Sequence, residues 1–166
     1  MTPARDRSEP DELDLDFDLE RIDSILVPTD GSPAAGEALE RAILIADAAD
    51  DDGPDRPIVH VLSVVDATSD PLRFGAAEVA DLERAKWRLV EDVVATVDSR
   101  DCEVRPAVRR GRPASTILSY AADNDVDLLV VGRTGRGNIE RTLLGSVTDR
   151  LLRRSPIPVL VVPAPS

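Results

Sequence analysis

A glycine-rich segment carries the clearest chemical signal in the chain. Residues 132–137 read Gly-Arg-Thr-Gly-Arg-Gly, and residues 145–148 read Gly-Ser-Val-Thr. Glycine permits positive φ and admits a bulky anion close to the main chain, and a helix N-terminus supplies unpaired N–H donors and a positive dipole end. Spaced glycines with Arg133 and Arg136 therefore predict a phosphate site. The alternative is that the glycines serve only a tight turn between a strand and a helix.

A second polar loop, residues 28–32, reads Pro-Thr-Asp-Gly-Ser and also follows an apolar run. The carboxylate of Asp30 can accept hydrogen bonds from ribose hydroxyls, and apolar strand residues can form a floor for a base. Ligands of doubly wound sheets bind beyond the carboxyl ends of the strands, so both loops line one crevice if their strands are neighbours. Asp30 has an equally good structural role, as an Asx-turn residue or a helix cap.

Two common phosphate motifs do not fit the glycine-rich segment. The Walker pattern requires a lysine directly after its second glycine, but Gly137 is followed by Asn138. The dinucleotide fingerprint belongs after the first strand of its unit and has Gly-x-Gly-x-x-Gly spacing. Neither its position nor its spacing is found here, so we expect a phosphate site of another kind.

Alternating strands and helices must position these loops. Short apolar runs indicate strands, and apolar residues at helical spacing indicate the helices between them. The strands are expected at 25–28, 57–65, 103–108, 127–131 and 159–162, and the helices from residue 33 and at 79–97, 113–124 and 146–154. This alternation predicts an α/β fold, a single doubly wound domain whose five-stranded parallel sheet carries two helices on each face.

The composition indicates one domain with an aliphatic core and an acidic surface. The 166 residues are 42% hydrophobic but only 2% aromatic, and the net charge is −12. Such a charge argues against binding to nucleic acid or to an anionic membrane. All of the twenty basic residues except Lys86 are arginines, and an acidic, lysine-poor surface is typical of adaptation to high salt. Without a signal peptide or a long apolar run, we expect a cytoplasmic protein.

Residues 1–22 differ from the rest of the chain. From Ser8 to Glu20 acidic residues alternate with Leu and Phe. The charge is too dense for a strand to be expected, and we expect a disordered or loosely docked acidic extension. The alternatives are an edge strand, a partner-binding segment and, more weakly, a metal site made by Asp14, Asp16 and Asp18.

The spacing Gly132-x2-Gly135-x9-Gly145-Ser146 resembles the ATP-binding branch of the universal stress protein family. The resemblance extends over about residues 23–163, through the opening ILVPTDGS and the closing LLGSVTDRLLRRSPIPVLVV. It implies the strand order 3-2-1-4-5 and a nucleotide-binding domain over residues 23–166. The acidic composition favours a halophilic archaeon as the source.

The same resemblance implies the nucleotide site, residue by residue. Adenine and ribose would lie near Pro28, Thr29 and Asp30, and Val64 would contact the base. Ribose and phosphates would lie among Gly132, Arg133, Gly135, Gly145, Ser146, Val147 and Thr148. The residue pattern agrees, because Ser146 can cap the following helix with Asp149 at the capping-box position. One departure is Ser63, which stands where the family commonly has His.

The residues indicate binding rather than efficient catalysis. His60 is expected to be a packed strand residue with no evident partner for nucleophilic catalysis, and Cys102 lies at the start of a strand. ATP is the expected ligand, with ADP or AMP as alternatives. Mg²⁺ can arrive with the phosphates, but the sequence supplies no metal site of its own. We expect a regulatory or stress-response factor, and the alternatives are a nucleotide-free interaction module and a slow ATPase or phosphotransferase.

Two partners are expected besides the nucleotide. The apolar strand 159–162 ends the chain, and by the resemblance it forms a sheet edge that pairs with a second subunit. An unpaired apolar edge invites association, which predicts a homodimer. A protein that reads the nucleotide state is also expected, and its identity does not follow from the sequence.

Overall fold

The computed structural model describes residues 21–49, 56–66, 75–97, 102–134 and 143–165. Strands and helices alternate along the chain as predicted, with ends within a few residues of the expected ones. The elements are β1 (Ser24–Pro28), α1 (Pro33–Ala49), β2 (Ile58–Val65), α2 (Ala76–Ala95), β3 (Glu103–Arg110), α3 (Pro113–Asp123), β4 (Leu128–Gly132), α4 (Ser146–Arg154) and β5 (Val159–Val162). None of the helices in this described part is long and apolar enough to cross a membrane.

The strands form one parallel sheet in the order β3-β2-β1-β4-β5, which confirms the predicted architecture. Ile25 of β1 lies opposite Val59 of β2 on one side and Leu128 of β4 on the other. The chain therefore adds β2 and β3 on one side of β1, and then β4 and β5 on the other. The strand order reverses between β1 and β4, which is where such sheets leave a crevice.

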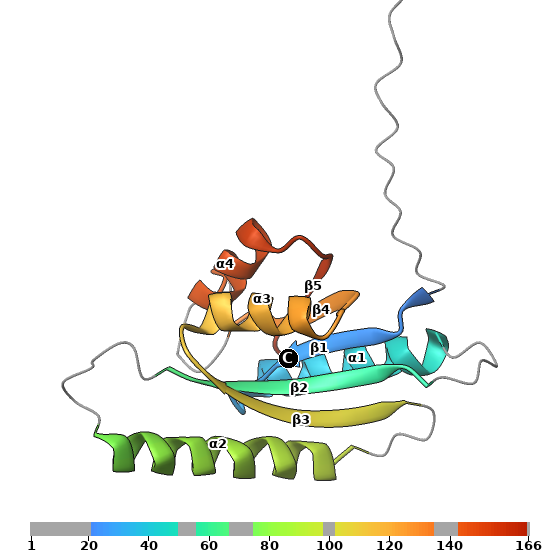
Figure 1. The fold of residues 1–166 in the computed structure, drawn as a ribbon. Helices are drawn as coiled ribbons and strands as arrows, with labels where there is room; N and C mark the ends of the chain where they lie inside the picture. Colours follow the sequence, from blue (N-terminus) through green and yellow to red (C-terminus); the bar gives the residue numbers. More distant parts are fainter. Residues whose placement is uncertain (1–20, 50–55, 67–74, 98–101, 135–142, 166) are drawn as a thin grey trace, which may run out of the picture.

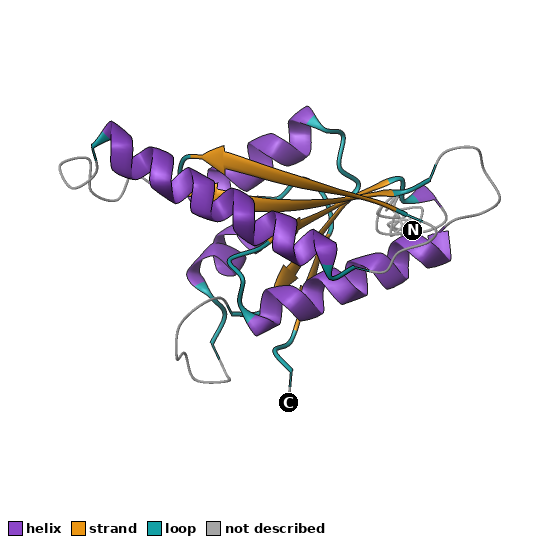
Figure 2. Ribbon diagram, turned by 90° about the horizontal axis from the view of Figure 1, so that it is seen from below, coloured by secondary structure: helices purple, strands orange, loops and turns teal. Residues whose placement is uncertain are grey.

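Two helices cover each face of the sheet, as predicted. Figure 1 shows α3 and α4 above the strands and α2 below them, and Figure 2, seen from below, shows α1 and α2 in front of the strands. On the lower face, Ala38 and Val90 pack against strand residues such as Val27. On the upper face, Ile117 and Leu151 pack against strand residues such as Leu62. Aliphatic side chains make up most of both core clusters.

Proline in a strand is tolerated here because β3 lies at the edge of the sheet. Glu103 N–H donates to the carbonyl of Pro57, and Gly111 N–H donates to that of Val65. The N–H and C=O groups of successive strand residues point alternately to the two sides of the strand. Those of the odd-numbered residues of β3 therefore point toward β2, and the backbone of Pro106 faces away from it. The missing N–H of Pro106 therefore falls on the open side, the usual place for proline in a sheet.

The domain begins slightly earlier than the sequence boundary placed it. Ile22, the last residue of the predicted extension, is only 2% exposed and belongs to the lower core. The carboxylate of Asp127 accepts hydrogen bonds from the N–H groups of Asp23 and Ser24, both at 3.0 Å. These bonds fix the entry to β1. Residues 1–20, and with them the rest of the predicted extension, lie outside the described part.

Candidate functional site

An open cavity of about 340 Å³ lies at the carboxyl edge of the sheet, where β1, β2 and β4 end. It contains most of the residues that the sequence predicted for a nucleotide site. The predicted residues that line it are Pro28, Thr29, Asp30, Val64, Gly132, Gly145, Ser146, Val147 and Thr148. Arg133 is not among the lining residues, and Gly135 lies outside the described residues. The two loops thus meet in one cavity because β1 and β4 are neighbours.

The loop after β1 is held by hydrogen bonds of its own polar residues. Thr29 N–H donates to the carbonyl of Leu62 at 2.8 Å, which ties the loop to β2. The carboxylate of Asp30 accepts from Ser32 N–H at 2.9 Å, and the Ser32 hydroxyl accepts from Ala35 N–H at 3.3 Å. Ser32 therefore caps α1, and Asp30 has the Asx-turn role. Asp30 also lines the cavity, so its turn role positions the carboxylate there.

Gly132, the last residue of β4, is required by packing within the protein. A Cβ at this position would come within 2.8 Å of the carbonyl carbon of Ala34 and 2.9 Å of its oxygen. Such distances force the backbone of α1 to shift. The first glycine of the predicted phosphate loop thus allows α1 to approach β4 closely, a role that needs no ligand.

The base of the glycine-rich loop is closed by backbone hydrogen bonds. Gly145 N–H donates to the carbonyl of Arg133 at 2.9 Å, and Arg133 N–H donates to that of Val162 at 2.8 Å. The Thr148 hydroxyl, on a side chain that is 6% exposed, donates to the carbonyl of Gly132 at 2.8 Å. The start of α4 is therefore fixed against the ends of β4 and β5. The hydroxyl hydrogen of Thr148 is already used in this bond and is not available to a phosphate.

The N-terminus of α4 faces the cavity with backbone donors. The cap is Gly145, so the prediction that Ser146 caps this helix is wrong, and Ser146 is the first helical residue. The first bond of the helix runs from Asp149 N–H to the Gly145 carbonyl at 2.9 Å. The N–H groups of Ser146, Val147 and Thr148 precede it and have no acceptor within the helix. All three residues line the cavity, which makes a site suited to an anion.

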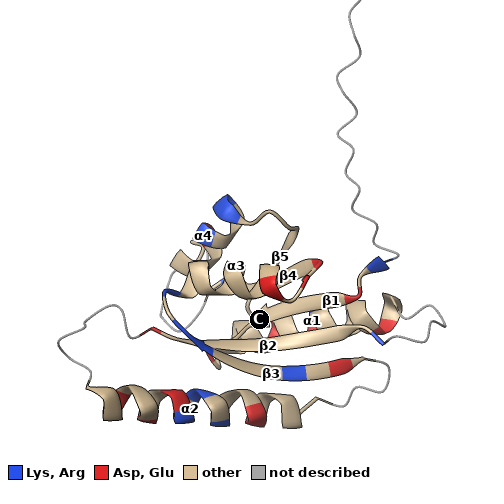
Figure 3. Cartoon of the chain, in the orientation of Figure 1, with Lys and Arg blue, Asp and Glu red and all other residues tan. Residues whose placement is uncertain are grey.

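The charges on α4 are arranged along its dipole. Arg153 and Arg154 lie in the last turn, and Figure 3 shows basic residues in blue on α4. Asp149 lies in the first turn, where its carboxylate pairs with Arg153 at 3.0 Å. This pairing offsets a negative charge that would otherwise oppose an anion at the same helix end.

Much of the remaining cavity wall is apolar. Leu62 and Val64 alternate with the buried Ser63 along β2 and so share a face, opposite Ile117 of α3 and Leu151 of α4. The residues that sequence reasoning missed are Ser32, Ala35, Leu62, Lys86, Pro113, Ile117, Val131, Thr134 and Leu151. Leu62 could have been predicted from the sequence, because side chains two residues apart on a strand share a face and Val64 was already expected in the site. Lys86 of α2 and Ile117 of α3 could not be predicted in this way, because they are brought to the cavity by the packing of their helices on the sheet.

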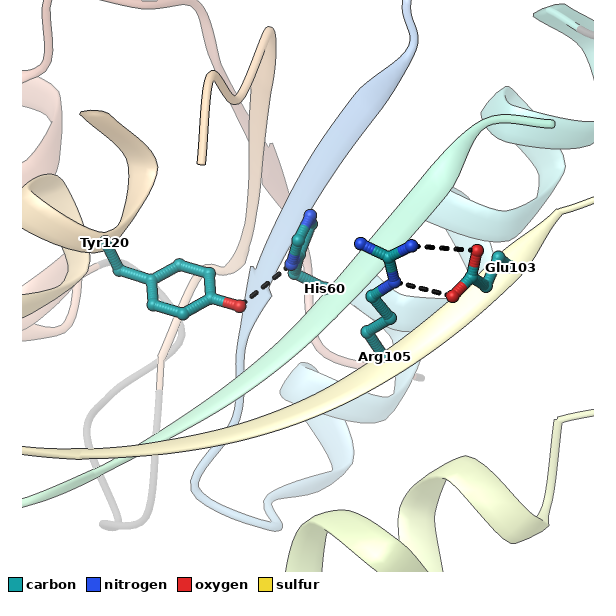
Figure 4. Close-up of polar contacts among 4 residues, drawn as sticks. All are labelled: His60, Glu103, Arg105 and Tyr120. Carbon is teal, nitrogen blue, oxygen red and sulfur yellow. Dashed lines mark hydrogen bonds and ion pairs between the residues drawn. The ribbon is translucent and has the colours of Figure 1, made fainter. Parts of the chain in front are cut away.

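A buried polar pair lies beside this wall. His60 Nδ1 and the Tyr120 hydroxyl are joined by a hydrogen bond of 2.8 Å, with the rings edge to face (Figure 4). Burial is the main cause that lowers the pKa of His60, and the neighbouring Arg105 lowers it further. Burial also raises the pKa of Tyr120. His60 is thus a packed strand residue whose uncharged form is favoured by burial, two residues before Leu62 on the same face of β2.

A second interaction of Tyr120 involves an arginine on the edge strand. The guanidinium of Arg109 lies 5.1 Å from the centre of the Tyr120 ring. Arg105, which is opposite His60 in the register, forms an ion pair with Glu103 (Figure 4). The described part of the chain has no group of three or more His, Cys, Asp or Glu side chains that could hold a metal. The hydrogen bond between His60 of β2 and Tyr120 of α3 anchors that helix to the sheet.

Comparison with known proteins identifies relatives over almost the whole described chain. The model of the universal stress protein family matches residues 21–163. Universal stress protein MJ0531 of Methanocaldococcus jannaschii is 31% identical over 145 residues, which cover 85% of this chain and 82% of the relative.

Solved structures agree with this match. Protein MJ0577 superposes with a TM-score of 0.70 at 27% identity, covering 87% of this chain and 98% of that one. A universal stress protein solved in complex with cAMP superposes with a TM-score of 0.58 at 26% identity, covering 87% of this chain and 98% of that one.

Proposed function

The chain belongs to the universal stress protein family, and on that premise we propose that it binds adenine nucleotides in the cavity at the carboxyl edge of the sheet. ATP is the expected ligand, with ADP or AMP as alternatives. One observation carries the proposal. The three N–H groups at the start of α4 and the apolar wall around Val64 line the same cavity, with Asp30 also in its lining.

Each part of that cavity matches one part of a nucleotide. The helix N-terminus suits phosphates, the Asp30 carboxylate suits ribose hydroxyls, and an apolar wall suits the faces of a base. Mg²⁺ would arrive with the phosphates. The structurally similar family member in complex with cAMP supports an adenine nucleotide as the class of ligand.

We expect nucleotide binding to serve regulation or a stress response rather than rapid turnover. A general base for attack on the terminal phosphate must lie within hydrogen-bond reach of the attacking water. In the proposed site the Asp30 carboxylate lies at the ribose and not at the terminal phosphate, that of Asp149 is paired with Arg153, and His60 is buried against Tyr120. Slow ATP hydrolysis or phosphotransfer is the alternative activity, and a nucleotide-free interaction module is the alternative without activity.

Equilibrium titration tests the proposal. Calorimetry with ATP, ADP, AMP and adenosine should give measurable affinity for all four, with adenosine the weakest because it has no phosphate, and ATP should be released from the protein largely unchanged. Absence of binding to all four would overturn the nucleotide function and favour the interaction module. Multiple-turnover release of phosphate would instead establish an ATPase.

The setting of this function is also a proposal. We expect a cytoplasmic homodimer that pairs through β5, passes its nucleotide state to a protein partner and works at high salt. The charge of −12 and the single lysine support the last point, because strong screening tolerates self-repulsion among acidic groups. Thermal unfolding measured at increasing KCl concentration tests this point. The midpoint temperature should continue to rise at KCl concentrations well above about 0.5 M, where screening of charges is nearly complete.

A further inference from the structure

Lys86 is a basic residue on a side of α2 that packs against the sheet. Leu82 and Val90, one turn before and after it, belong to the lower core, and residues four apart lie on the same side of a helix. Lys86 is half-buried, whereas the basic residues nearest to it on this helix, Arg84 and Arg88, are exposed. Burying part of a charged side chain costs free energy, so apolar packing alone does not explain a lysine here.

The side chain of Lys86 lines the cavity at the carboxyl edge of the sheet. It is the contribution of α2 to that lining, since the other lining residues come from strands, loops, α1, α3 and α4. A long side chain can lay its methylenes along an apolar surface and present its ammonium group elsewhere. A lysine side chain is thus part of the cavity lining, in addition to the backbone donors at the start of α4.

The strand order places Lys86 away from the phosphate site. Helix α2 packs on β2 and β3, whereas α4 begins beyond the end of β4. Because β1 lies between β2 and β4, the lining runs from the start of α4, past Asp30, to β2. There Val64 lies on the upper face of the sheet, and Lys86 reaches the cavity from α2 on the lower face. A ligand with its phosphates on α4 and its base beside Val64 would place its nucleoside on the β2 side of the cavity, which Lys86 also lines.

We propose that Lys86 is a ligand-contacting residue that donates a hydrogen bond to the nucleoside end of the bound nucleotide. This inference rests on the proposed function. An ammonium group has three donors and no acceptor, so it selects ring nitrogens or hydroxyl oxygens of the ligand and disfavours an amino group. Lys86 already takes part in an interaction within the chain, and the number of its donors allows a ligand contact as well.

The test compares ATP with adenosine, which has no phosphate. Calorimetry is carried out with the full chain, with Lys86→Met and with Arg88→Met, a matched loss of one exposed positive charge on the same helix. Loss of a charged hydrogen bond weakens binding by about tenfold or more. Lys86→Met should lower the affinities for ATP and for adenosine by the same factor, and Arg88→Met should leave both affinities unchanged.

Each other result contradicts the inference. A loss confined to ATP would show that Lys86 acts on the phosphates, and equal affinities of Lys86→Met and the unchanged protein would show that it contacts no ligand. If the unchanged protein binds neither ligand, the proposed function itself fails. Thermal unfolding without ligand checks that the variants are folded, and Lys86→Gln, which keeps a polar side chain, replaces Lys86→Met if the latter is not.

Discussion

The hydroxyl oxygen of Tyr120 lies 2.8 Å from Nδ1 of His60, and both side chains are buried between β2 and α3. The pair is the polar counterpart of the apolar contacts that hold α3 on the sheet. It tolerates burial because each polar group satisfies the other. Protonation of His60 would create a buried positive charge that is repelled by Arg105, whose guanidinium lowers the pKa of the imidazole.

This pair predicts that stability falls in mild acid. The folded pKa of His60 lies below its ordinary value of 6.5, so between the two values the unfolded chain binds a proton that the folded chain does not. Stability rises with pH wherever the unfolded state binds more protons. The free energy of unfolding should therefore decrease as the pH is lowered from about 8 through 6.5 to the folded pKa.

Chemical denaturation at several pH values measures this effect, with His60→Gln as the control. The difference in stability between the unchanged protein and His60→Gln should shrink as the pH falls, because the variant has no imidazole to protonate. A difference that stays constant from about pH 8 to about pH 5 would contradict the assignment. The pKa of Glu103 is lowered mainly by its hydrogen bond to Arg105, so protonation of Glu103 affects stability only at more acid pH.

Gly132→Ala should destabilise the protein even without nucleotide. The added methyl group would overlap the backbone of Ala34, and overpacking of this kind typically costs about 1–3 kcal/mol. Chemical denaturation of the ligand-free protein measures the change. Gly36→Ala, within α1 and with nothing within 4 Å of the added Cβ, should instead stabilise by about 0.5–1 kcal/mol. Unchanged stability of Gly132→Ala would refute the packing role.

Ser146→Pro should remove one phosphate donor and keep the helix. Proline is tolerated at the first helical position, and the backbone of Gly145 (φ −61, ψ 150) suits a residue before proline. The affinity for ATP should fall by about tenfold, while that for adenosine stays the same. Ser146→Ala keeps the N–H and should lose much less. Equal losses in the two variants would assign binding to the hydroxyl instead of the backbone.

Val161→Pro should convert a β5-paired dimer into monomers. Leu129 N–H donates to the carbonyl of Pro158, and Arg133 N–H donates to that of Val162, so the even-numbered residues of β5 face β4. The N–H of Val161 then points to the open edge, where a second subunit would bond to it. Light scattering should show dimers for the unchanged protein and for Val161→Thr, which keeps the N–H. A dimer that survives Val161→Pro would place the interface elsewhere.

Sequence patterns were sufficient for the architecture of this domain. The β1–α1 and β4–α4 connections could be assigned because strand ends, helix starts and glycine spacing are local properties of neighbouring residues. The strand order followed from the resemblance, and it brought Asp30 and Val64 into the same cavity as Gly145 and Ser146. The order of elements along the chain shows which strands a helix connects, but it does not by itself fix which strands are neighbours in the sheet.

Tertiary structure alone decided what several of these residues do. Gly132 reads as a phosphate-loop glycine in sequence, yet the approach of Ala34 from α1 requires it. The cap of α4 is Gly145 and not Ser146, because the Thr148 hydroxyl and the Gly145 N–H tie that helix to the end of β4. Lys86 has no motif around it and reaches the cavity through the packing of α2. Local sequence determines which elements form, whereas contacts between elements distant in sequence determine the side chains that meet at the site.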